Sequence, residues 1–201
     1  MGDKIKTAIE IAMEKAALLD DLSPEEKEAL LNKKKLEPIM VEFYRIKIGP
    51  DELWKKLKGE NTSLLSDAQL NLIGSLKFGM PVDEIQRRKK GILALETLKP
   101  EKKTAIIEQG LGLLETLQKK AEEEKKHVYG EFKKAIEKNP QARVRMVEQG
   151  DAKIVTKISL EEAIIQNPQW KQFLLEFMNN YQQEFERIIS QIKKNFVSIG
   201  Y

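Results

Sequence analysis

The sequence predicts a mainly α-helical protein with a long antiparallel helical hairpin and a small β-hairpin at about residues 142–158. Three observations support this fold class. Apolar residues recur at helical spacing over most of the chain, proline and capping motifs mark helix starts, and only one segment alternates as strands do. The content of charged residues, 33%, against 41% hydrophobic residues suits a helix-rich protein with a modest core.

The N-terminal region, residues 1–99, should begin with two helices. The first, at residues 5–20, carries its apolar positions on one face. A capping box at residues 23–26 begins the second, which should reach Lys34 or Lys35 before Pro38 interrupts or kinks it. The periodicity of residues 39–48 leaves helix and strand open, and the helical surroundings favour helix. The apolar face of the first helix consists of Ile5, Ala8, Ile9, Ala12, Met13, Ala16 and Leu19.

Three more helices are expected in this region. Pro50 begins a short one that Gly59 closes. A second capping box, at residues 66–69, begins a helix that should run to Gly79. Pro81 then begins a helix with apolar residues up to Leu95.

Residues 100–201 form the second predicted region, and a single domain for the whole chain stays open as the alternative. A very long helix should run from Pro100 to Asn139. Residues 142–158 alternate around Gly150-Asp151, which predicts a β-hairpin. An isolated hairpin is marginally stable, so it must lie on a helix or on another chain. A capping box at Ser159 begins a short helix before the last one.

The last helix carries the strongest pattern in the chain. Between residues 170 and 196 the large apolar side chains fall within a stripe roughly 160° wide, and the segment spans roughly 40 Å. The preceding long helix could cover this stripe, but its own apolar residues thin out around residues 119–127. Packing within the chain and packing against a second subunit therefore both remain open. The stripe consists of Trp170, Phe173, Leu174, Phe177, Met178, Tyr181, Phe185, Ile188, Ile189, Ile192 and Phe196.

The chain also resembles a known family. The opening Ile5-Lys6-Thr7-Ala8-Ile9-Glu10-Ile11-Ala12-Met13-Glu14-Lys15 is similar to the start of a family of uncharacterised bacterial helical proteins of unknown function. The later order of a charged helix around residues 113–134, a short strand containing Arg-Val and a last helix rich in Gln and aromatic residues also looks like that family. The resemblance implies a helical fold and no particular catalytic residue.

Residues suited to catalysis or to metal binding are few, and we predict no catalytic, cofactor-binding or metal site and no cofactor. The chain has no cysteine, and its one histidine, His127, lies among charged residues as an exposed side chain would. Glutamate clusters at residues 122–124, 161–162 and 184–186 leave a carboxylate- or metal-dependent enzyme as the least favoured alternative. Gly110-Leu111-Gly112 lacks the residues of a phosphate loop and suggests close helix packing.

A basic cluster gives a second alternative, a nucleic-acid-associated protein. Arg87, Arg88, Lys89 and Lys90 open a segment, residues 85–103, that holds seven positive and two negative charges. Such a cluster could track phosphates. The small net charge of the chain, +3, favours an ordinary solvated helix face instead.

These observations favour a non-enzymatic structural or protein-interaction module that self-associates through its long helices, in the manner of a coiled coil. A homo-oligomer or a complex with a helical partner is expected, in the cytoplasm, since no leader or membrane span is apparent. Buried aromatic residues dominate interface energetics. The expected anchors are Trp170, Phe173, Phe177, Tyr181, Phe185 and Ile188.

Overall fold

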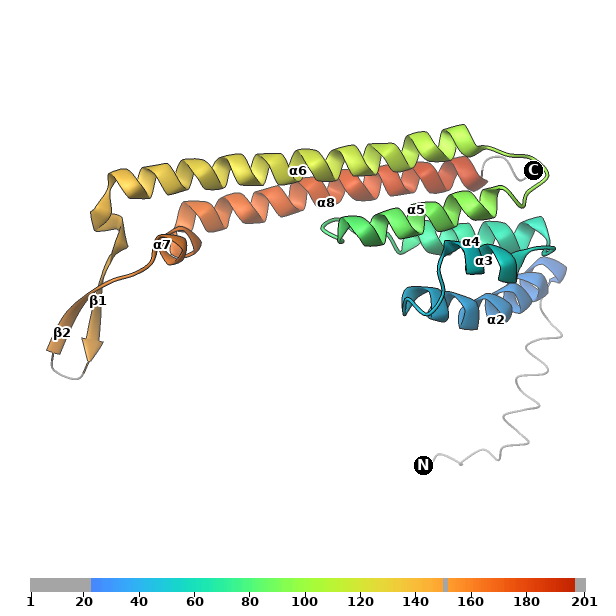
Figure 1. Ribbon diagram of the computed structural model, residues 1–201, viewed down its shortest axis with the longest axis horizontal. Coiled ribbons are helices and arrows are strands. Elements are labelled where there is room, and N and C mark those ends of the chain that lie inside the picture. Colours follow the sequence, from blue (N-terminus) through green and yellow to red (C-terminus); the bar gives the residue numbers. More distant parts are fainter. Residues whose placement is uncertain (1–22, 150–151, 198–201) are drawn as a thin grey trace, which may run out of the picture. The chain divides into compact units, whose positions relative to one another are not determined.

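The computed structural model describes residues 23–149 and 152–197, which form a mainly α-helical protein with one two-stranded sheet (Figure 1). The described chain divides into two compact units. Unit 1 holds the residues up to Ser75 together with Val82–Thr104, and unit 2 holds Leu76–Pro81 together with the chain from Ala105 onward. The helix expected at residues 5–20 lies outside the described residues.

Unit 1 consists of four helices, α2 (Pro24–Tyr44), α3 (Pro50–Leu57), α4 (Thr62–Gly74) and α5 (Val82–Glu96). Its core is made of fully buried side chains from all four helices. At Gly91 in α5 the helices come so close that an added Cβ would lie 3.3 Å from atoms of Leu72 and Phe43. The core includes Phe43, Leu53, Leu57, Leu65, Leu72, Ile73, Ile92 and Leu95.

Helix α2 starts where the capping box predicts, but it does not stop before Pro38. The Ser23 hydroxyl accepts a hydrogen bond from the Glu26 amide, and the Glu26 carboxylate accepts one from the Ser23 amide. The helix then continues through Pro38 to Tyr44, so Pro38 does not interrupt it, which was one of the two expected alternatives. Leu36, Met40 and Phe43 are buried on both sides of the proline. This burial outweighs the one backbone hydrogen bond that proline removes.

The start of α4 also differs from the prediction. The helix begins at Thr62, not at the expected capping box of residues 66–69. The Asn61 side chain caps it by accepting a 2.7 Å hydrogen bond from the Leu64 amide. Asn is as good an N-cap as Ser, and here its position puts Leu64 and Leu65 in the core.

Unit 2 is built on two long helices, α6 (Thr104–Lys138) and α8 (Pro168–Val197), which run side by side and antiparallel (Figure 1). The expected long helical hairpin is thus present, with α6 beginning at Thr104, after Pro100. The chain between these helices forms a 3-10 turn (Pro140–Arg143), strands β1 (Val144–Gln149) and β2 (Ala152–Lys157), and helix α7 (Leu160–Gln166). The Ser159 capping box predicted for α7 is confirmed.

The expected β-hairpin is confirmed as well. Strands β1 and β2 are antiparallel, and the register pairs Val144 with Lys157 and Met146 with Val155. The two strands make the whole sheet within the part of the chain that the structure describes. None of the helices described is long and apolar enough to cross a membrane.

Candidate protein-interaction surfaces

The apolar face of α8 is covered by the same chain over most of its length. Of the six expected anchors, five are buried and Phe173 is half-buried. They contact α6, α7 and the segment Leu76–Pro81 of unit 2. Packing within the chain, one of the two alternatives that the sequence left open, therefore accounts for the stripe. The buried anchors are Trp170, Phe177, Tyr181, Phe185 and Ile188.

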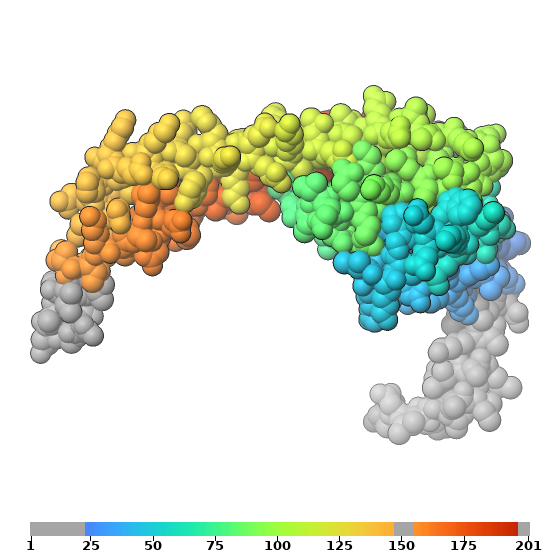
Figure 2. Space-filling view, viewed as in Figure 1, coloured from blue at the N-terminus to red at the C-terminus, as the bar shows by residue number. Residues whose placement is uncertain are grey.

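The N-terminal end of α8 lies in an aromatic cluster with the end of α6. The Trp170 ring packs edge-on against Tyr129 and Phe132, at centroid distances of 5.6 and 5.5 Å. Ile136 of α6 and Ile164 of α7 complete the buried centre of this cluster. In Figure 2 the side chains of α7 and of the start of α8 lie directly against the end of α6.

The middle of α8 faces the charged stretch of α6, and here the segment Leu76–Pro81 supplies the missing apolar cover. The Phe78 ring stacks on Tyr181 at a centroid distance of 5.7 Å and contacts Phe177 and Phe185 at 6.3 and 6.2 Å. Gly79, with φ +76°, allows the sharp turn that follows Phe78. The Gln118 amide of α6 donates to the Met80 carbonyl at 3.2 Å and holds this segment on the helix.

Phe78 is the residue of this surface that the sequence analysis missed. A single aromatic residue in a short connection has no periodicity to reveal it. Its place in the sequence was the one available signal. Phe78 lies just before Gly79 and Pro81, which are typical of a turn. A large aromatic side chain in a surface turn would face water unless another part of the chain covered it.

Tyr181 forms the polar border of this aromatic seam. Its hydroxyl donates a 2.5 Å hydrogen bond to the Glu124 carboxylate of α6. Burial, together with the hydrogen bond to this carboxylate and its negative charge, raises the pKa of Tyr181 to about 12. The charged stretch of α6 thus contributes one specific contact to the seam.

Near the C-terminal end of α8 the two long helices pack at close range. An added Cβ on Gly110 of α6 would lie 2.7 Å from Cγ1 of Ile192. A Cβ added on Gly112 would meet no atom within 4 Å. The close helix packing that the Gly110-Leu111-Gly112 sequence suggested is therefore present at Gly110 only.

The β-hairpin presents the opposite case, an apolar pair that the described chain leaves uncovered. Met146 and Val155 face each other across the two strands and are 73% and 65% exposed. Both strands also have an unpaired outer edge in the described structure. The hairpin extends away from the ends of α6 and α8 (Figure 1).

The base of the hairpin is firmly held. The Arg143 guanidinium donates to the Ile158 carbonyl at 3.0 Å, and the Ile158 amide donates to the Arg143 carbonyl at 2.9 Å. Ala142 and Ile158 pack on the cluster around Trp170. The hairpin is thus an exposed element on a buried aromatic base.

The two edges of the hairpin differ in charge. Strand β2 carries Lys153 and Lys157, and lysines on an edge strand discourage pairing with a further strand. Strand β1 carries one basic residue, Arg145, whose guanidinium donates to the carbonyls of Ala142 and Val144. Strand β1 is therefore the less protected edge.

The basic cluster of α5 does not form a free cationic surface, because its two arginines are used inside unit 1. Arg87 pairs with Glu84, donates to the Phe43 carbonyl at 2.6 Å and stacks on the Phe43 ring. Arg88 is buried, pairs with Glu84 and donates to the Ser75 hydroxyl at 3.0 Å. These arginines hold the pKa of the Glu84 carboxyl below its usual range.

Lys89 is half-buried, as Arg87 is, and Lys90 is exposed. Two lysines make a much smaller polyanion site than the four-residue cluster that the sequence suggested. The structure therefore gives the nucleic-acid alternative no specific support.

The residues considered for acid–base chemistry are exposed or already paired. Glu122, Glu123, Glu161 and Glu162 are exposed. Glu124, also exposed, accepts the Tyr181 hydrogen bond, and Glu184 is paired with Arg187. His127 is exposed, and its Nε2 lies 3.4 Å from Oε1 of Glu131. Among the described residues no three His, Asp or Glu side chains gather as a metal site would require. Nothing in this arrangement favours the enzyme alternative.

Comparison with protein-family models, with curated proteins and with solved structures found no match in any of the three.

Proposed function

We propose that this protein is an interaction module that self-associates, and that its β-hairpin joins the two copies. The aromatic anchors expected from the sequence are used within unit 2, so the face of α8 is not available for this role without unfolding. The hairpin is held in place at its base, and its apolar pair, Met146 and Val155, is exposed. The hairpin is therefore the better candidate for the surface through which two copies associate.

The exposed Met146–Val155 pair carries the proposal. Two-stranded hairpins have marginal stability in water unless another layer or strand supports them. None of the helices that the structure describes covers this pair, as its exposure shows. A further strand or sheet from a second copy would supply the support.

The charge difference between the edges favours pairing through β1. A two-fold antiparallel pairing centred on Met146 sets Val144 opposite Glu148 of the second copy and Arg145 opposite Val147, so no like charges meet. The equivalent pairing of β2 centred on Val155 would set Lys153 opposite Lys157. The proposed assembly is therefore a four-stranded sheet with the two β1 strands at its centre.

Oligomeric state provides the test. We expect the natural chain to behave as a dimer in size-exclusion chromatography with light scattering, and Met146→Glu/Val155→Glu to behave as a folded monomer. The matched control is Leu175→Glu/Met178→Glu, which changes two exposed apolar residues of α8 and should leave the dimer intact. A natural chain that is monomeric at all concentrations, or a dimer that the hairpin variant keeps, would contradict the proposal.

Cysteine cross-linking tests the edge, since the chain has no cysteine of its own. In the proposed pairing the two Met146 residues lie directly opposite each other, at a Cα separation of about 4.5–5.5 Å that suits a disulfide. Met146→Cys should therefore give a covalent dimer on mild oxidation, and Val155→Cys should not. A dimer from Val155→Cys alone would assign the contact to β2 instead.

A further inference from the structure

We propose that a groove between α2 and α4 of unit 1 is the docking site of residues 5–19 of the same chain, bound as a helix antiparallel to α2. This inference does not depend on the function proposed above. It concerns a different unit and a different surface. It assigns the amphipathic N-terminal segment, which lies outside the described residues, a partner within the chain.

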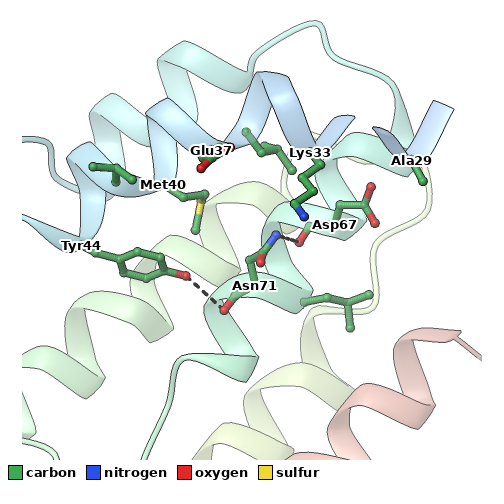
Figure 3. Close-up of a pocket in the computed structure, with 10 residues that line it drawn as sticks. Ala29, Lys33, Glu37, Met40, Tyr44, Asp67 and Asn71 are labelled. Atoms are coloured by element: carbon green, nitrogen blue, oxygen red, sulfur yellow. Dashed lines mark hydrogen bonds between the residues drawn. The ribbon is translucent and has the colours of Figure 1, made fainter. Parts of the chain in front are cut away.

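The groove is open and has an apolar floor (Figure 3). Its volume is about 550 Å³, and it runs along one face of α2 with α4 as the second wall. Leu36 and Met40 form buried parts of the floor, while Val41 is 41% exposed. The lining residues are Ala29, Lys33, Leu36, Glu37, Met40, Val41, Tyr44, Asp67, Leu70 and Asn71.

Hydrogen bonds fix the two helices that make the groove. The Tyr44 hydroxyl donates to the Asn71 carbonyl at 3.1 Å at one end (Figure 3). The buried Asn32 side-chain amide of α2 also donates to the Asp67 carboxylate of α4 at 2.9 Å and to the Ser63 hydroxyl at 3.2 Å. The groove is thus a built feature of unit 1, with a mixed polar rim.

The length of the segment matches the length of the groove. From Ala29 to Tyr44 the α2 face extends about 22 Å, and a helix over residues 5–19 extends about 21 Å. The connection between them, residues 20–23, is as short as most connections between antiparallel helices. Such a short connection also keeps the segment at a high effective concentration beside α2, which favours docking within the chain over docking on a second copy.

The apolar face of the segment fits the floor in this antiparallel arrangement. A turn at residues 20–23 sets Ala16 near Ala29, Ala12 near Lys33 and Ile9 near Leu36. Small residues over this end of the floor allow close approach of the two helices, and Ile9 and Ile5 supply bulk toward Leu36 and Met40. The docked segment would cover apolar surface that α2 and α4 now leave open.

Disulfide cross-linking in the full chain tests the site. Ala12→Cys/Lys33→Cys should form an intramolecular disulfide on mild oxidation, seen as a faster band on a non-reducing gel. The matched control, Ala12→Cys/Leu31→Cys, places the second thiol on the far side of α2, where Leu31 is 66% exposed, and should cross-link at least tenfold more slowly. Equal rates for the two pairs, or no disulfide in either, would overturn the proposal. A disulfide found only between two copies would overturn docking within the chain.

Hydrogen exchange gives a second measurement that needs no cysteine. Ile9→Asp places a charge on the apolar face of the segment, whereas Ile11→Asp makes the same change on its opposite face. We expect amide exchange over residues 29–41 to speed up at least threefold in Ile9→Asp and to stay unchanged in Ile11→Asp. Unchanged exchange in both variants, or an equal increase in both, would contradict the proposal.

Discussion

The apolar face of α8 and the apolar pair of the β-hairpin differ in what covers them. The α8 face is long and rich in aromatic residues, and α6, α7 and the segment Leu76–Pro81 cover it. The hairpin pair is short, and Met146 and Val155 are more than half exposed. The apolar face of α8 thus packs inside unit 2, whereas the Met146–Val155 pair of the hairpin remains accessible to another molecule.

The size of an apolar pattern therefore does not identify an interface. In the middle of α8 the apolar face is covered by Phe78, because α6 has few apolar residues there. No comparable side chain in the described structure reaches the hairpin pair. Coverage by the rest of the chain, rather than hydrophobicity alone, separates a core from a docking surface.

The largest expected difference between the two regions is the loss of stability when one apolar side chain in each is truncated to alanine. Phe177→Ala removes a buried aromatic ring and should lower the free energy of unfolding by about 3–5 kcal/mol. Met146→Ala changes a side chain that the single chain leaves exposed, and at protein concentrations where the chain is monomeric it should change the free energy of unfolding by less than about 0.5 kcal/mol. Denaturant unfolding followed by Trp170 fluorescence, in a Trp54→Phe background, measures both within unit 2. Similar losses from the two substitutions would remove the distinction between core and surface.

A pair of glycines tests how tightly the α8 face is sealed. Gly110→Ala brings a Cβ against Ile192 and should lower the free energy of unfolding by about 1–3 kcal/mol. Gly112→Ala meets open space and should raise it by up to about 1 kcal/mol, because alanine is the better helix former. Thermal unfolding of the two variants should show midpoints displaced in opposite directions. A stabilising Gly110→Ala would mean that α6 and α8 pack more loosely than the structure shows.

The smallest expected effect concerns Tyr181 at the border of the seam. Its pKa is raised from about 10 when unfolded to about 12 when folded, so its contribution to stability is complete below pH 10 and is lost as pH rises towards 12. We expect the free energy of unfolding to fall over this window, and to fall less in Tyr181→Phe. Equal alkaline losses in the two proteins would show that Tyr181 does not keep its proton in the seam.

Local signals in the sequence predicted most of the elements. The capping boxes at Ser23 and Ser159 mark true helix starts, and the alternation around Gly150-Asp151 marks a true hairpin. These signals succeed because the groups that they satisfy lie within a few residues of each other. The sequence left open whether Pro38 interrupts its helix, because the burial of Met40 and Phe43, which outweighs the local cost of the proline, is a tertiary effect.

The functional surfaces were less predictable, because they depend on contacts between residues far apart in the sequence. Arg87 and Arg88 resemble a phosphate-binding cluster as a sequence, yet their partners include Phe43 and Ser75, which lie in other elements. Likewise, the Gln118 contact to Met80 joins residues 38 positions apart. No periodicity within one helix reports such partners.

The helical class, the long helical hairpin, the β-hairpin and the apolar stripe of the last helix can be predicted from the sequence, since each follows from residue spacing and short-range hydrogen bonding. The tertiary structure was needed to find what covers that stripe and that Met146 and Val155 are exposed. Burial depends on the assembled chain and not on one segment. A side chain such as Phe78 removes an apolar face from water only when the fold brings the two together.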